Sequence, residues 1–265
     1  YPVGLQLWLF LAFFAAFAVK MPMFPIHTWL PDAHTEAPTA GSVILAGILL
    51  KMGAYGFLRF SLPMFPLAVN MLFIPLLILS VTAIIYGAYV TLMQNDIKRL
   101  IAYSSVSHMG FVTLGIFTLN QTGIEGGILQ MINHGIITGG LFLCIGMIYE
   151  RTHTRMIEDY GGLAKTVPVY MIFFTIFTLA AIGFPGLNAF VGEFLIISGA
   201  FKANMVIAAF SIIGIVLGTT YMVWLYYRVG FNEMKSATKP RLYDLEVREI
   251  ATLIPLVFLI ILIGL

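Results

Sequence analysis

Five ionisable residues lie within or beside long apolar stretches of this chain, namely Lys20, Lys51, His108, His134 and Glu193. A charge at the centre of a bilayer costs at least about 2.5–3.5 kcal/mol, and residues that bear this cost normally face a bundle interior and belong to ion or proton paths. Lysine, histidine and glutamate side chains can each bind and release a proton. The five residues together therefore predict a proton relay across several helices.

The composition predicts that lipid surrounds most of the chain. Of its 265 residues, 60% are hydrophobic and only 10% are charged, and the mean hydropathy is +0.97. A soluble domain carries about 25% charged residues. A membrane-crossing helix needs roughly 20 apolar residues, and eight stretches meet or approach this length: 4–30, 39–61, 67–93, 99–119, 124–149, 167–201, 204–229 and 250–265. We expect an all-α polytopic membrane protein, a helical bundle that forms a single transmembrane domain over residues 1–265.

Two of these stretches contain residues that break a helix. Prolines interrupt the first stretch between residues 22 and 31, and each removes a backbone N–H and clashes with the carbonyl four residues back. The sequence Gly-Phe-Pro-Gly at 183–186 interrupts the sixth stretch. Irregular backbone at membrane depth occurs only where it is buried in protein or lines a wet cavity. We therefore expect two broken transmembrane helices, with Lys20 beside the first break and Glu193 beside the second.

The other three residues are expected near the middle of the membrane. Lys51, His108 and His134 lie about 9 to 12 residues into their stretches, which at 1.5 Å per residue is close to mid-span. Structural roles are the alternative. A lone histidine can bond a carbonyl of a neighbouring helix, and Lys51 and Glu193 can belong to structural ion pairs. In that case the chain would be a membrane scaffold that transports nothing.

Positive charges are distributed unequally between the two ends of the predicted bundle. If the spans alternate, one side has only Arg59 and Lys202, which we expect to be interfacial anchors. The other side is predicted to be cytoplasmic or its equivalent by the positive-inside rule, and it carries Lys98, Arg99, Arg151, Arg155, Lys165, Arg228, Lys235, Lys239, Arg241 and Arg248. Asp32, His34 and Glu36 fall in the loop after the first break, where we expect them to be solvated.

Other kinds of chemistry have little support in the residues. The lone Cys144 cannot form an intrachain disulfide or hold an iron–sulfur cluster, which needs about four thiolates. A net charge of +2, without a basic run, does not favour a nucleic-acid partner. The sequence has no phosphate-binding glycine loop and no His-Glu-x-x-His zinc motif.

Three segments carry a resemblance to a known family. Residues 20–38 read KMPMFPIHTWLPDAHTEAP, residues 49–59 read LLKMGAYGFLR, and residues 183–193 read GFPGLNAFVGE. Together they resemble the antiporter-like membrane subunits of respiratory complex I, NADH:quinone oxidoreductase. The acidic residue at 193 resembles the subunit M (NADH dehydrogenase chain 4) branch of this family, because the paralogous subunits L and N usually carry lysine there.

The resemblance implies a role for each of the five residues. Lys20 matches a central proton carrier, whose partner glutamate lies on an earlier helix outside this chain. Lys51 and His134 match links of a hydrophilic axis, His108 matches a polar residue of the same route, and Glu193 matches its terminal acid. The resemblance also implies an inverted-repeat antiporter-like fold in which the two breaks are symmetry mates. The chain would then be a fragment, with N-terminal helices and the C-terminal end missing.

The resemblance further implies a function and partners. In this family, quinone reduction elsewhere in the complex drives proton translocation, so NADH, FMN, iron–sulfur clusters and quinone are expected in partner subunits, with no cofactor or metal in this chain. The expected partners are the other membrane subunits, especially L and N, and the lipid of a bacterial plasma membrane rather than an organelle inner membrane. The alternative is a subunit of a multisubunit Na⁺/H⁺ antiporter or of a membrane-bound hydrogenase.

Overall fold

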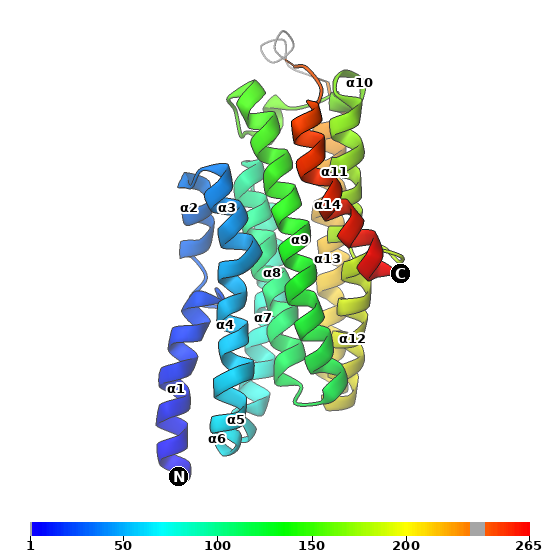
Figure 1. The fold of residues 1–265 in the computed structure, drawn as a ribbon. Coiled ribbons are helices and arrows are strands. Elements are labelled where there is room, and N and C mark those ends of the chain that lie inside the picture. The colour runs from blue at the N-terminus through cyan, green and yellow to red at the C-terminus, as the bar shows by residue number, and fades with distance from the viewer. Residues whose placement is uncertain (1, 234–241) are drawn as a thin grey trace.

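The described part of the chain is a bundle of helices. The computed structural model describes residues 2–233 and 242–265, and these residues contain no β-strand (Figure 1). Seven helical segments are long and apolar enough to cross a membrane: Val3–Lys20, Thr39–Met64, Phe73–Leu92, Ile97–Phe117, Gln121–Thr152, Met205–Phe231 and Val247–Gly264. The prediction of an all-α polytopic bundle is confirmed. The sixth predicted stretch, 167–201, forms two shorter helices, Pro168–Ala181 and Asn188–Ala203.

The elements up to residue 92 include several short helices and two π-helical segments. In chain order they are α1 (Val3–Lys20), α2 (Trp29–Glu36), α3 (Thr39–Ile44), η1 (Leu45–Leu49), α4 (Leu50–Gly56), η2 (Phe57–Ser61), α5 (Leu62–Met64), α6 (Pro66–Met71) and α7 (Phe73–Leu92). The remaining elements are α8 (Ile97–Phe117), α9 (Gln121–Thr152), η3 (Ile157–Asp159), α10 (Leu163–Thr166), α11 (Pro168–Ala181), α12 (Asn188–Ala203), α13 (Met205–Phe231) and α14 (Val247–Gly264).

Helical structure is interrupted at both positions where the sequence predicts a break. α1 ends at Lys20 and α2 begins at Trp29, so the first proline-rich segment lies between them. α11 ends at Ala181 and α12 begins at Asn188. In the connecting turn, Gly183 and Gly186 have φ of 75° and 90°, a conformation that glycine adopts without a steric penalty. That each pair of helices forms one broken transmembrane span stays a prediction.

The stretch predicted at 39–61 is helical but not a regular α-helix. It contains two π-helical segments, η1 and η2, with α4 between them. A π-helical turn adds a residue to the turn, and such turns are frequent at functional sites. The ammonium of Lys51, in the first turn of α4, donates a hydrogen bond to the carbonyl of Ala46 within η1. The irregular turn therefore supplies an acceptor for a lysine that is partly buried in an apolar bundle.

α8 and α9 form the centre of the bundle. Within an 18-residue apolar stretch of each helix, 89% of the residues of α8 and 72% of those of α9 are buried. Figure 1 shows α9 running through the middle, with α3 and α4 on one side and α11 to α14 on the other. Glycine permits the close approach of α9 to η1, because a Cβ added at Gly135 would lie 2.8 Å from the Gly47 carbonyl oxygen. This contact brings α4 and α9 close enough for their polar side chains to meet.

The described cations of the larger predicted group lie at or near the ends of helices. Lys98 and Arg99 begin α8, Arg151 ends α9, and an isolated bridge between Asp96 and Met156 joins the segments that carry these two ends. Three members of that group, Lys235, Lys239 and Arg241, lie outside the described residues. The assignment of this end to the cytoplasmic side stays a prediction.

Candidate functional site: a line of titratable side chains

The site begins at a contact between two helices. Lys51 of α4 and His134 of α9 approach each other with 2.7 Å between Nζ and Nδ1. A charged lysine has only donors, so His134 Nδ1 must accept and the ring then carries its own proton on Nε2. His134 is 3% exposed, and its Nε2 has no hydrogen-bond partner among the described residues. While Lys51 is charged, it therefore holds the proton of the neutral His134 ring on Nε2.

The line continues from α9 through α8 to α12. The rings of His134 and His108 have centroids 5.8 Å apart. His108 Nδ1 then lies 3.5 Å from Glu193 Oε1, and its Nε2 lies 3.4 Å from the hydroxyl of Tyr221. Both His108 and Glu193 are largely enclosed, with side-chain exposures of 13% and 7%. Four of the five predicted residues therefore form one line of neighbouring groups inside the bundle.

A small cavity lies beside this line. Its volume is about 10 Å³, close to the space that one water molecule occupies. His108 and His134 line it from two helices, together with Ser104, Gln130 and Thr138. Ile137, Leu141, Ala181 and Ala189 complete its walls, so polar groups from two helices face one another here within a mostly apolar lining.

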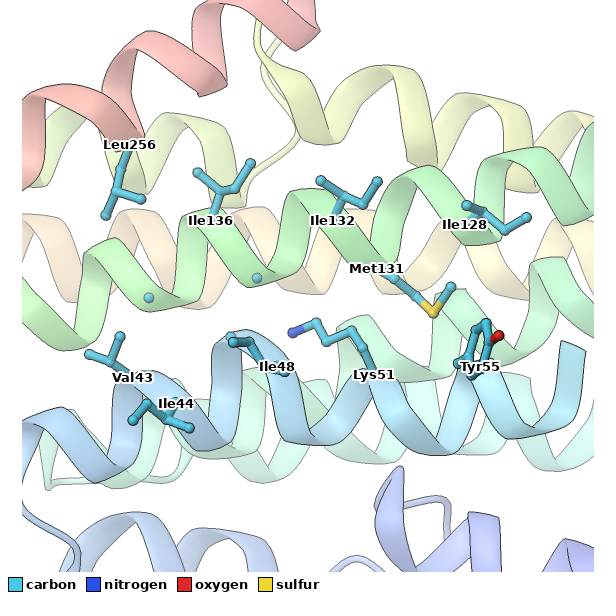
Figure 2. A pocket seen from close by; sticks show the side chains of 13 residues that line it. Val43, Ile44, Ile48, Lys51, Tyr55, Ile128, Met131, Ile132, Ile136 and Leu256 are labelled. Atoms are coloured by element: carbon cyan, nitrogen blue, oxygen red, sulfur yellow. The ribbon is translucent and has the colours of Figure 1, made fainter. Parts of the chain in front are cut away.

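Lys51 also borders a larger and apolar groove. This groove has a volume of about 580 Å³ and runs between α4 and α9. Figure 2 shows the Lys51 side chain lying between the two helices, with Ile48 and Ile132 nearby and Tyr55 and Met131 farther along the groove. Lys51 is thus in contact with His134 on one side and with an apolar opening on the other.

Lys20 is not part of this line. It is the last residue of α1, its side chain is exposed, and no contact with the other four residues is recorded in the described part of the chain. The sequence places Lys20 beside the first break but cannot say which way its side chain faces. The predicted relay roles of all five residues stay predictions.

One residue differs from its expected environment. We expected His34 to be solvated, but it is fully buried, and its ring stacks on Phe142 with centroids 4.6 Å apart. Burial, and then the charges of Lys98 and Lys51, lower the pKa of His34 to about 4. Asp32 and Glu36 on the same short helix are exposed, as expected. The regular spacing of His34 from Leu30 on α2 is the signal that could have found it, because both lie on one face of that helix.

Sequence reasoning also missed the amides around Glu193. Gln130 Nε2 donates to Glu193 Oε1 at 3.1 Å, and Asn133 joins Gln130 to the first residue of α12. Amide side chains within an apolar helix were the available signal, since buried polar groups need partners.

In residues 2–233 and 242–265, no group of three or more His, Cys, Asp or Glu side chains has an arrangement that could hold a metal ion.

Comparison with known proteins agrees with this architecture. The family described as "NADH:quinone oxidoreductase/Mrp antiporter, TM" matches residues 3–263. NADH-quinone oxidoreductase subunit M of Rhodobacter capsulatus is 55% identical over 261 residues, which are 98% of this chain and 51% of that protein. The chain therefore spans about half the length of this curated relative.

Solved structures share the fold over nearly the whole chain. A chain of respiratory complex I from Thermus thermophilus with bound NADH superposes with a TM-score of 0.91 at 37% identity, covering 98% of this chain and 55% of that one. A chain of the membrane-bound sulfane sulfur reductase, an archaeal respiratory membrane complex, gives 0.90 at 28% identity, covering 96% and 44%. The protein is a multi-pass membrane protein that belongs to the NADH:quinone oxidoreductase/Mrp antiporter transmembrane family.

Proposed function

We propose that this chain is part of a proton-translocating membrane subunit of NADH:quinone oxidoreductase, of the subunit M type. The observation that carries the proposal is the line from Lys51 through His134 and His108 to Glu193, which joins the four helices α4, α9, α8 and α12 inside an apolar bundle. The similarity to subunit M of Rhodobacter capsulatus supports the choice of complex. Such a complex is an enzyme in which this subunit moves protons and carries no redox centre.

Each residue of the line has a part in the proposed relay. A proton that passes from the Lys51 ammonium to His134 Nδ1 leaves a neutral amine and an imidazolium. The imidazolium releases its Nε2 proton toward His108, and His108 Nδ1 faces the carboxylate of Glu193. The apolar surroundings keep bulk water away from these groups, so a change of charge at one of them is felt strongly by the next.

Lys20 and the partner subunits complete the proposal. Lys20 is assigned the role of a carrier on the family resemblance alone, with its partner glutamate on helices outside this chain. The proposed partners are the other membrane subunits of the complex, including the paralogues L and N. NADH, FMN, the iron–sulfur clusters and quinone would be bound by partner subunits. Similarity to bacterial subunit M chains supports the bacterial plasma membrane as the location.

The test is Glu193→Gln in the assembled complex. We expect normal assembly and a clear loss of protons translocated per NADH oxidised, because the amide cannot release a proton. Glu125→Gln is the matched control, since Glu125 is an exposed residue of α9 whose carboxylate accepts a hydrogen bond from Gln121, one turn earlier on the same helix. Normal pumping in Glu193→Gln would refute the relay, and failure to assemble with normal pumping per electron in the remaining complex would favour a scaffold.

A cation exchanger is the second candidate. The family description includes Mrp antiporters, and the fold is shared with a chain of a membrane-bound sulfane sulfur reductase, an archaeal respiratory membrane complex. Separation of native complexes on a gel stained for NADH oxidation distinguishes the two. Migration of this chain apart from NADH activity, together with transport that depends on sodium at fixed pH, would replace the first proposal with the second.

A further inference from the structure

Two buried amides on α9 connect Glu193 to the start of α12. Gln130 Nε2 donates to Glu193 Oε1 at 3.1 Å, and Asn133 Nδ2 donates to Gln130 Oε1 at 3.3 Å. The same Nδ2 donates to the backbone carbonyl of Asn188 at 2.8 Å. Gln130 is 1% exposed and Asn133 is fully buried, so these groups cannot exchange their partners for bulk water.

The carbonyl of Asn188 determines the direction of both amides. A carbonyl oxygen only accepts hydrogen bonds, so Asn133 must present its NH₂ group there, and that same group then faces Gln130. Gln130 must therefore accept this hydrogen bond with its Oε1. Its NH₂ group is left facing Glu193 Oε1, which must accept. One backbone group therefore ensures that the carboxyl of Glu193 meets a donor at Oε1.

Glycines allow this arrangement to be compact. A Cβ added at Gly192 would lie 2.5 Å from Gln130 Oε1, so a larger residue at this position would displace the amide. On the other side of the carboxyl, a Cβ added at Gly183 would lie 2.8 Å from Glu193 Oε2. The two carboxyl oxygens thus have different surroundings, with amide and imidazole donors at Oε1 and the turn after α11 at Oε2.

We propose that Gln130 and Asn133 are positioning residues that hold Oε1 of Glu193 as the accepting oxygen and direct its exchangeable proton to Oε2, against the turn at Gly183. The proposal rests on Glu193 being a proton carrier, as proposed above. In the carboxylic acid, the carbonyl oxygen is the better acceptor and the hydroxyl oxygen is a poor one. A donor fixed at Oε1 therefore makes Oε1 the carbonyl oxygen and leaves the proton on the side that faces the turn.

The experiment is pH-difference infrared spectroscopy of the purified complex. The carboxyl band of Glu193 is assigned by its absence in Glu193→Gln. In Gln130→Met, which keeps the volume and removes the amide donor, we expect the C=O stretch to shift upward, because a carbonyl that loses its shorter hydrogen bond and keeps only the 3.5 Å contact with His108 vibrates at higher frequency. In Asn133→Leu, which does not touch Glu193, we expect the band to split, because the Gln130 amide can then adopt both orientations.

Controls separate positioning from packing. Thr113→Val removes another buried polar group, whose recorded bond stays within α8, and should leave the band unchanged. Gln130→Asn, one methylene shorter, provides the same test if Gln130→Met does not assemble. An unshifted band in an assembled Gln130 variant would overturn the inference, even where Glu193→Gln abolishes pumping. Shifted bands together with normal pumping in Glu193→Gln would uphold the positioning and refute the relay, and a wild-type complex with no Glu193 band would refute both.

Discussion

Arg151→Met should loosen the attachment of α14 to the bundle. The Arg151 side chain, at the end of α9, is 3% exposed and bonds both carboxylate oxygens of Glu249 at 2.8 and 2.6 Å. Its Nε donates to the Tyr243 carbonyl at 2.9 Å, and its guanidinium lies 4.3 Å from the centre of the Tyr243 ring. Only 11% of the 18 residues of α14 are buried against the rest of the bundle. This cluster is therefore a large share of what fixes the start of that helix.

The cost follows from leaving a buried charge without its partner. Removing one member of a buried ion pair costs about 3–5 kcal/mol, whereas replacing both is often close to neutral. Arg151→Met should therefore shift the docking equilibrium of α14 by roughly a hundredfold or more. Adding Glu249→Gln removes the unpaired charge, so the double variant should be more stable than Arg151→Met alone.

The assay is the temperature at which the detergent-solubilised complex loses this subunit on a native gel. The expected order of midpoints is wild type, then the double variant, then Arg151→Met. Arg99→Met is the control, because Arg99 and Asp32 are 42% and 69% exposed and an exposed pair contributes about 0–1 kcal/mol. The reasoning would be refuted if the double variant had a lower midpoint than Arg151→Met, with a shift from wild type equal to the sum of the shifts of the two single variants.

Three further predictions concern the line and its surroundings. Gly192→Ala should lower the thermal midpoint and pumping, because its Cβ would lie 2.5 Å from Gln130 Oε1 and overpacking costs about 1–3 kcal/mol, whereas Gly4→Ala, with nothing within 4 Å, should be silent. Burial lowers the pKa of His34 to about 4, so its ring stays neutral in the folded protein, while the ring of the unfolded chain gains a proton below about pH 6.5. The free energy of unfolding should therefore fall by up to about 3 kcal/mol as the pH drops from about 6.5 to 4. His34→Phe should make the thermal midpoint less dependent on pH in this range, and an unchanged dependence would contradict the assignment. Tyr221→Phe should reduce pumping less than Glu193→Gln, since its 3.4 Å contact with His108 is near the limit of a hydrogen bond, and an equal loss measured as protons per NADH would show that the hydroxyl belongs to the path.

Local chemistry explains what could be predicted about the fold. Long apolar runs indicated the membrane spans, because roughly 20 such residues match the hydrocarbon thickness whatever surrounds them. Proline and glycine indicated where α1 and α11 end, since their effect on the backbone is confined to a turn. The π-helical segments η1 and η2 could not be predicted, because they depend on how that helix meets its neighbours.

The sequence by itself determined that lipid surrounds most of the chain, that the fold is all-α and where helices are interrupted. It also determined which residue types are available to carry protons. Spacing along the chain also indicated that Lys51, His108 and His134 lie at similar depth. Only the tertiary structure decided that these three and Glu193 meet while Lys20 lies apart, that His34 is buried, and that Gln130 presents a donor to Glu193. The physical reason is that depth follows from counting residues, whereas the direction of a side chain depends on the rotation of its helix, and packing against the other helices sets that rotation.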